Sequence, residues 1–159
     1  MSRESAEPGS GSLPEAINQD VSQLIHHLRC SNAPDEVLAE ATRHIQLALN
    51  TLKPWLQQGE GWSTISMGGD IPRFPWREDD LTAVMPYSPI SGKRNPIAPP
   101  IRMWKAGDNE VRGEVIFSPT YAGPPDSVHG GIIAAVFDEV LAMSNVISGT
   151  AGFTGTLTI

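Results

Sequence analysis

The stretch from Tyr121 to Gly149, YAGPPDSVHGGIIAAVFDEVLAMSNVISG, most limits what this chain can fold into. Its second part is an apolar run that predicts a long helix from about Gly130 to Ser148. The only formal charges of that run are Asp138 and Glu139, near its middle. Because an unpaired carboxylate is costly to bury, an apolar helix with charges at its centre needs a structural or a chemical explanation.

Helical spacing separates the side chains of this run into two faces. Small or polar residues share a face with Asp138, in steps of three, four and seven: Gly131, Ala134, Ala135, Ala142 and Asn145. A bulky stripe occupies another face: Val136, Val140, Met143 and Ile147. The spacing therefore predicts that Asp138 lies in a seam where another molecule can come close. Four residues of that seam are candidate substrate contacts: Gly131, Ala134, Ala135 and Asn145.

Composition limits the class of protein. A length of 159 residues predicts one domain with an appendage, and a formal charge of −7 argues against nucleic acid or an anionic membrane as the main partner. Cys30 is the only cysteine, which excludes an internal disulfide and a cysteine-based metal cluster. We expect no metal site, and we interpret His26, His27 and His44 as ordinary surface or interface residues.

The ends and the apolar run bear on location. The first residues, MSRESAEPGSGS, lack the apolar core of a secretory signal, so we expect a cytoplasmic protein. The run from Gly130 to Gly149 is long enough to cross a bilayer, but its central acidic pair makes insertion costly. We therefore expect a soluble chain without a membrane span.

The chain divides into four predicted segments. Residues 1–12 are predicted to be a disordered tail, and residues 13–56 a hairpin of two amphipathic helices, one ending near Cys30 and the other near Lys53-Pro54 or one turn later. Residues 57–100 are rich in glycine, proline and aromatic residues, which favours an ordered strap. Residues 101–159 begin with a predicted β-hairpin, with strands over 101–105 and 111–117, and end in a predicted strand over 153–159.

The start of the long helix has its own chemistry. Backbone N–H groups at a helix start have no intrahelical partner, so Gly130 could donate to a carbonyl oxygen that becomes an oxyanion. Asp138 could act as a general base or a nucleophile. Eight residues of helix span roughly 12 Å, so one chain cannot bring both groups to one small reacting centre. Two antiparallel copies could, which predicts a site shared across a dimer. In the alternative interpretation, H-G-G is only a turn into the helix, and the acidic pair is a surface edge.

The pattern P-P-x-x-V-H-G-G, with Asp138 nine residues after His129, resembles the hotdog-fold acyl-CoA thioesterases, most closely the PaaI-like and Them-type branches. The resemblance spans about Ile101 to Ile159. It implies an α+β hotdog fold, in which a curved antiparallel sheet wraps a long central helix. It also implies that His129 and Gly130 hold the thioester carbonyl, that Asp138 activates water or attacks, and that Thr154 orients the water.

The function implied by this resemblance is hydrolysis of a fatty or aryl acyl-CoA to the free acid and coenzyme A, in a homodimer or tetramer and without a further cofactor. Hydratase patterns of the same fold match less well, because their aspartate precedes the histidine on the helix. Dehydratase patterns also match less well, because they have a glutamate on the helix and an H-x-x-G-x-P loop before it. A hotdog domain continues with about three more strands, so we expect a fold truncated after the central helix, with the stripe that contains Val136 partly uncovered. The alternatives are a non-catalytic acyl-CoA-binding or interaction module and an inactive fragment.

Overall fold

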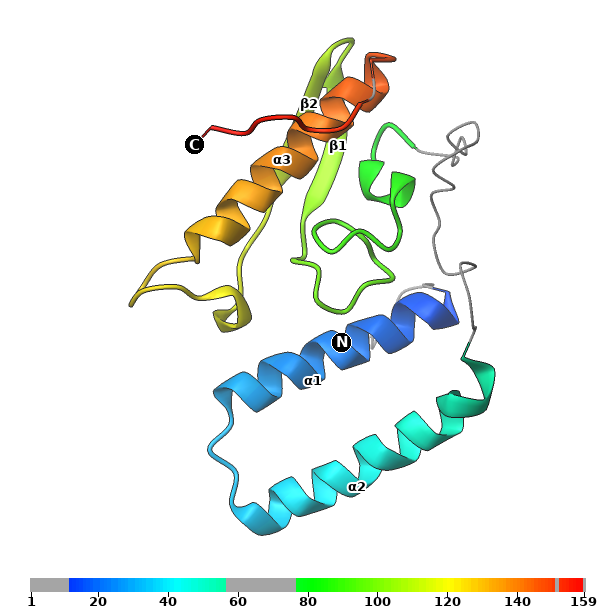
Figure 1. Cartoon of the computed structure of the whole chain (residues 1–159), viewed down its shortest axis with the longest axis vertical. Helices are drawn as coiled ribbons and strands as arrows, with labels where there is room; N and C mark the ends of the chain where they lie inside the picture. The colour runs from blue at the N-terminus through cyan, green and yellow to red at the C-terminus, as the bar shows by residue number, and fades with distance from the viewer. Residues whose placement is uncertain (1–11, 57–76, 151, 159) are drawn as a thin grey trace, which may run out of the picture. The chain divides into compact units, whose positions relative to one another are not determined.

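The structure is a computed structural model that describes residues 12–56, 77–150 and 152–158 (Figure 1). The predicted tail up to residue 11 and the first part of the predicted strap, 57–76, lie outside the described residues. The chain forms two compact units. One comprises residues 1–29 with 73–159, and the other residues 30–72.

Two long helices form where apolar residues recur at helical spacing. Helix α1 spans Leu13–Cys30 and α2 spans Asp35–Leu52, and each carries acidic side chains in its first turn, where they favour the helix dipole. A 3-10 turn, η1, follows over Lys53–Trp55, because Pro54 has no N–H group to continue the α-helical ladder. Neither α1 nor α2 has a buried residue, so both expose apolar side chains.

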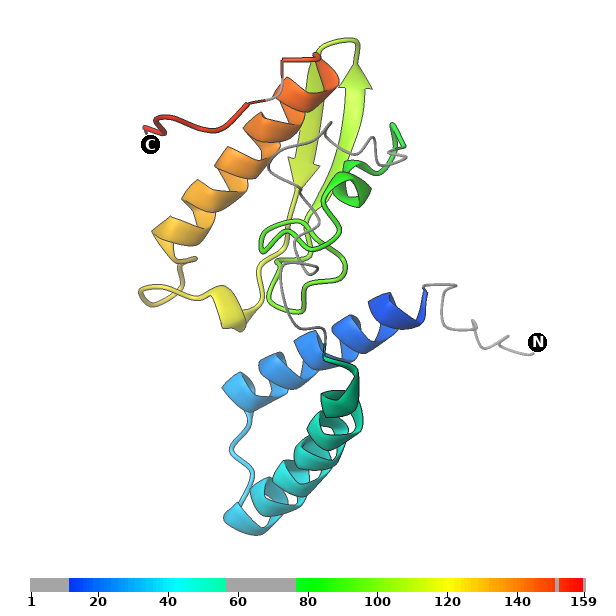
Figure 2. The same cartoon turned by 45° about the vertical axis from the view of Figure 1, so that its right-hand side comes forward.

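The predicted β-hairpin is present. Strands β1, Arg102–Gly107, and β2, Glu110–Glu114, pair antiparallel around a turn at Asp108-Asn109 (Figure 2). Strand β2 ends at Glu114, whereas the alternation predicted a strand to Phe117. Ile116 is 89% exposed, so no apolar surface holds this last part against a partner strand.

Helix α3, Gly130–Ile147, has the predicted extent and packs against β2 (Figures 1 and 2). Gly113 of β2 permits the approach, because a Cβ atom at that position would lie 3.1 Å from Cγ2 of Val140. The core of this unit is small. Among the described residues, its cluster of buried apolar side chains consists of Leu81, Ile101, Met103 and Met143.

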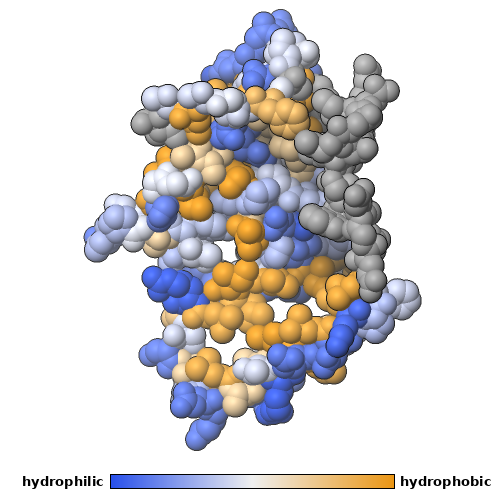
Figure 3. Space-filling view, viewed as in Figure 1, coloured by the Kyte–Doolittle hydropathy of each residue, from blue (hydrophilic) through white to orange (hydrophobic). Residues whose placement is uncertain are grey.

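The bulky stripe of α3, which was predicted to be partly uncovered, faces this core and is partly covered by it. Met143 is 1% exposed, and the other members pack partly buried around it: Val136, Val140 and Ile147. The uncovered apolar residues form the adjacent stripe instead: Ile133, Phe137 and Leu141. The view in Figure 3 shows apolar side chains interspersed along this helix at the molecular surface. The β-hairpin and the short 3-10 helix η3, Leu81–Val84, cover the face that contains Met143.

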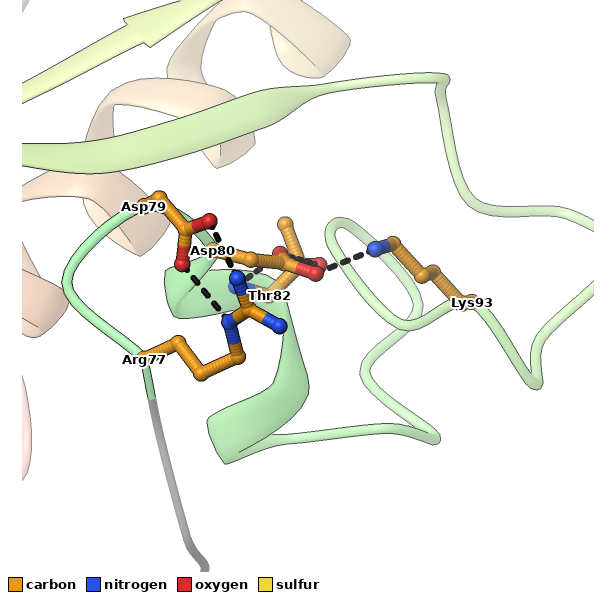
Figure 4. A network of polar contacts seen from close by, with 5 residues as sticks. All are labelled: Arg77, Asp79, Asp80, Thr82 and Lys93. Atoms are coloured by element: carbon orange, nitrogen blue, oxygen red, sulfur yellow. Dashed lines mark hydrogen bonds and ion pairs between the residues drawn. The ribbon is translucent and has the colours of Figure 1, made fainter. Parts of the chain in front are cut away.

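The segment Arg77–Pro100 packs beside β1 through a short 3-10 helix, η3, over Leu81–Val84. Asp80 caps η3, since its carboxylate accepts hydrogen bonds from the Thr82 backbone N–H at 3.2 Å and from the Thr82 hydroxyl at 2.6 Å. Lys93 forms an ion pair with the same carboxylate, and Arg77 binds Asp79 with two hydrogen bonds (Figure 4). Burial alone would raise the pKa of Asp80, but the bonds from Lys93 and Thr82 outweigh it, and the pKa is lowered.

The predicted strand after α3 does not form within residues 152–158, which is a correction. This segment has no ladder partner and bends at Gly155, and a strand needs a neighbour for its backbone hydrogen bonds. Helix α3 is the one helix of the described residues that is long and apolar enough to cross a bilayer, at 18 residues and a mean hydropathy of 1.5. Length and composition alone support this, and the core helix of a soluble domain has the same properties.

Candidate functional site

The loop before α3 turns back tightly on the residue that starts the helix. Ser127 N–H donates to Pro124 O at 3.0 Å, and Asp126 has a φ of 59°. A proline in second place and a positive φ in third place are characteristic of a type II turn. Gly123 lies against His129, where a Cβ atom would be only 2.8 Å from the His129 Cα. The double proline and this glycine therefore set the position of His129.

His129 is the N-cap of α3. Its Nδ1 accepts a hydrogen bond from Gly131 N–H at 3.0 Å, and its own backbone N–H donates to Tyr121 O at 3.0 Å. The ring lies over Gly131, because a Cβ atom there would be 3.2 Å from the ring Cε1. The helical spacing predicts Gly131 as a substrate contact, but in the structure its N–H already has the imidazole of His129 as acceptor.

Gly130 remains the open position of the H-G-G motif. A Cβ atom built on Gly130 meets no other atom within 4 Å, so the helix start is accessible. Its N–H points away from the interior of the helix, as first-turn donors do, and no described residue accepts a hydrogen bond from it. Gly130 is thus suited to donate to an oxyanion, with the positive end of the α3 dipole behind it.

Asp138 and Thr154 come together, sixteen residues apart in the chain. Thr154 Oγ1 donates to Asp138 Oδ1 at 2.7 Å. Asp138 is half-buried and Thr154 is exposed, so solvent reaches the pair. The segment after α3 crosses the helix to make this contact (Figure 1). Two residues that sequence reasoning assigned to one catalytic site are therefore direct partners.

The two halves of the predicted site lie at different points of α3. His129 and Gly130 are at its start, whereas Asp138 is eight residues further on, roughly 12 Å along the axis. A single copy does not bring them to one reacting atom. The remaining seam residues line the helix between and beyond these points, with Ala134 and Ala135 half-buried and Asn145 exposed.

Glu139 has a different environment from Asp138 and was not predicted as a site residue. Its Oε1 accepts hydrogen bonds from the hydroxyls of Ser88, at 2.6 Å, and Ser91. Both serines are buried, and Ser88 Oγ also accepts from the backbone N–H of Ile90 and Ser91. The helical wheel contained the signal, because Glu139 is three residues after Val136 and so belongs to the core-facing side. Its role is to attach the 85–92 loop to the middle of α3.

The surroundings of the helix start offer space for a ligand. A pocket of about 550 Å³ runs along the loop before His129, lined among others by Phe117, Pro119, Gly123 and Pro125. Its lining mixes apolar and polar atoms. Among the described residues, no group of three or more histidine, cysteine, aspartate or glutamate side chains gathers as a metal site.

Comparison with known proteins supports the fold. No protein-family model matches the chain, and no curated protein does. A crystal structure described as a thioesterase superfamily protein is similar, with a TM-score of 0.71 and 24% sequence identity over 96% of this chain and 72% of that protein. The chain therefore shares the fold of a thioesterase superfamily protein, and the prediction of an α+β, hotdog-like fold is confirmed at that level.

Proposed function

We propose that this protein hydrolyses the thioester of an acyl-CoA, in a site that two copies of the chain build together. The observation that carries the proposal is the Thr154–Asp138 hydrogen bond of 2.7 Å on the helix that His129 caps. The fold shared with a thioesterase superfamily protein and the H-G-G loop before α3 are both consistent with acyl transfer to water. Neither half of the site suffices alone, because the donor and the carboxylate are roughly 12 Å apart along α3.

The reaction begins with a water molecule beside Asp138. The carboxylate takes a proton from the water as its oxygen bonds to the thioester carbonyl carbon. The carbonyl oxygen becomes an oxyanion, and Gly130 N–H of the second copy donates to it. When the tetrahedral intermediate collapses, the carbon–sulfur bond breaks, and the thiolate receives the proton that Asp138 holds. The products are a free carboxylic acid and the coenzyme A thiol.

Thr154 has a supporting role in this scheme. Its hydroxyl occupies one carboxylate oxygen of Asp138, which fixes the plane of the carboxylate and leaves the second oxygen for water. His129 acts through the backbone. Because its Nδ1 accepts from Gly131 N–H, it keeps the first turn of α3 in the geometry that presents Gly130.

The proposal is tested by thiol release from acyl-CoA substrates of different chain length, with a thiol reagent as reporter. We expect Asp138→Asn to lower kcat/KM by about 100-fold or more, since positioned general bases contribute on this scale. Asp108→Asn, in the exposed β1–β2 turn, is the matched control and should keep wild-type activity. Full activity of Asp138→Asn would refute the assignment. Acyl-CoA binding by the wild-type chain without thiol release would instead support the non-catalytic binding module.

A further inference from the structure

Helix α2 presents an apolar stripe that the described residues of its own unit, 30–56, leave partly exposed. The stripe consists of residues in steps of three and four: Leu38, Ala41, Ile45, Leu49 and Leu52. Leu38, Leu49 and Leu52 are 39%, 56% and 50% exposed, whereas the central Ala41 and Ile45 are half-buried. Helices of this length gain most of their stability from burying such a face. The stripe therefore needs a cover, and the charges beside it indicate which one.

Asp35 and Lys53 lie on the same flank of this stripe, at opposite ends of α2. They are 18 residues apart, which is five turns at about 3.6 residues per turn, so their side chains leave the helix in the same direction. Lys53 keeps helical backbone angles, with φ −51° and ψ −41°. Both residues are exposed, and neither forms an ion pair with any described residue.

This arrangement is self-complementary in one orientation. When a two-fold axis relates two antiparallel copies of α2, the flank with Asp35 and Lys53 lies on the same side of the pair in both copies. Asp35 of one copy would then meet Lys53 of the other, and the symmetry would form the same ion pair a second time. In a parallel pair the opposite flanks would meet, so Asp35 would face the apolar Val37 of the second copy and gain no cation.

Helix α1 fits the charges less well as a cover. An antiparallel α1 could form an ion pair between its Arg29 and Asp35 of α2. On that flank it would offer Lys53 only the uncharged Pro14 and Asn18, because the acidic Glu15 at this end leaves the helix about 40° further round than Arg29. A second α2 satisfies both charges at once and matches apolar stripe to identical apolar stripe.

We propose that α2 pairs antiparallel with α2 of a second copy, with the stripe at the centre and two Asp35–Lys53 ion pairs at its ends. The inference does not depend on hydrolase activity, because it uses only the pattern and exposure of α2. Such a contact between copies is isologous.

A zero-length carbodiimide, which joins a carboxylate directly to an amine, tests the arrangement on the full chain. Within one α2, Asp35 and Lys53 are separated by about 27 Å, so a bond between them has to join two copies. We expect an Asp35–Lys53 cross-link in a covalent dimer. A mixture of isotope-labelled and unlabelled chains should give about half of these peptides as mixed pairs, identified by mass spectrometry. Cross-links that instead join α1 to α2, or an absence of the dimer, would overturn the proposal.

Charge exchange supplies the matched variants. Lys53→Asp alone should abolish the cross-linked dimer, and Asp35→Lys combined with Lys53→Asp should restore it through the exchanged pair. Glu36→Lys, whose side chain lies on the side of α2 opposite the stripe, should leave the yield unchanged. Circular dichroism of each variant separates loss of pairing from loss of helix. If the double variant is helical but does not restore the cross-linked dimer, the proposed Asp35–Lys53 ion pairs are refuted.

Discussion

Thr154 Oγ1 donates a hydrogen bond to Asp138 Oδ1 at 2.7 Å, so the segment after α3 returns across the middle of that helix. This contact fixes the orientation of a half-buried carboxylate that the small-residue face of α3 leaves open to solvent. It also links residues that are sixteen positions apart, and the geometry of the candidate site therefore depends on a short extended segment without a strand partner.

Removal of the Thr154 hydroxyl should lower the rate of the proposed thioester hydrolysis. Thr154→Val keeps the shape but removes the donor, and hydrogen bonds to charged groups contribute about 1.5–3 kcal/mol. We expect kcat to fall by roughly 10- to 100-fold with little change in KM, because the loss concerns the orientation of the base. Thr154→Ser should retain most of the activity.

Thr156→Val, two residues further along the same exposed segment, is the matched control for this effect. Its kcat should equal that of the wild type. If Thr156→Val and Thr154→Val were equally impaired, the cause would be disorder of the segment and not the loss of the Asp138 partner.

Two inactive variants should complement each other if the site is shared. In Gly130→Val the added side chain blocks access to the first N–H group, although a Cβ atom there meets nothing within 4 Å and the helix can still form. A mixed dimer of Gly130→Val and Asp138→Asn contains one intact site. Refolding an equal mixture should therefore restore about one quarter of the wild-type activity, since half of the dimers are mixed. Activity no higher than that of either variant alone would place donor and base in the same chain.

Helical spacing was sufficient to predict the extent of α3 and the different faces of Asp138 and Val136, because the helix repeat is local. The β1–β2 hairpin was predictable for the same reason, from alternation on both sides of Asp108-Asn109. The sequence could not predict which apolar stripe of α3 is covered, because that depends on where η3 and the hairpin lie in space. The stripe that contains Phe137 is exposed because of this tertiary arrangement and not because of its own sequence pattern.

The end of the chain shows a second limit. Residues after Phe153 are β-branched and predicted a strand, yet strand formation is decided by a neighbour that can accept the backbone hydrogen bonds. The family resemblance implied only that Thr154 orients a water molecule, and its hydrogen bond to Asp138 was not predicted. The Ser88–Glu139 contact joins residues 51 positions apart, and nothing local indicates that serine as the partner.

Gly92 should be among the least replaceable residues of the 85–100 loop. A Cβ atom at this position would lie 2.5 Å from both Pro86 O and Ser88 N, which are backbone atoms that cannot move aside independently. Gly92→Ala should therefore destabilise the fold by about 1–3 kcal/mol or more, as overpacking does. Urea unfolding measures the change. Gly152→Ala, where the added atom meets nothing within 4 Å, is the control and should stay close to the wild type.

Asp80 should make the stability of the fold depend on pH in acid. Its pKa is lowered in the folded chain, because hydrogen bonds from Lys93 and Thr82 outweigh the opposing effect of burial. The stabilisation is therefore complete above the unfolded pKa, about 3.9, and is lost as the pH falls through the lower folded value. Asp80→Asn should cost on the order of 1 kcal/mol at neutral pH and progressively less below about pH 4. Urea midpoints from pH 7 to pH 3 test this. A pH-independent difference from the wild type would contradict it.

Glu139 should prove important for stability, in contrast to its neighbour Asp138. Its carboxylate is the acceptor for two buried serine hydroxyls, and an unsatisfied buried donor costs about 1–3 kcal/mol. Glu139→Leu should therefore lower the free energy of unfolding by several times the effect of Glu110→Leu, an exposed carboxylate replaced on β2. Glu139→Gln should lose less, because its amide oxygen still accepts. In a double-mutant cycle, Ser88→Ala and Glu139→Leu should couple by about 0.5–3 kcal/mol. Additive effects would mean that the two side chains stabilise the fold independently.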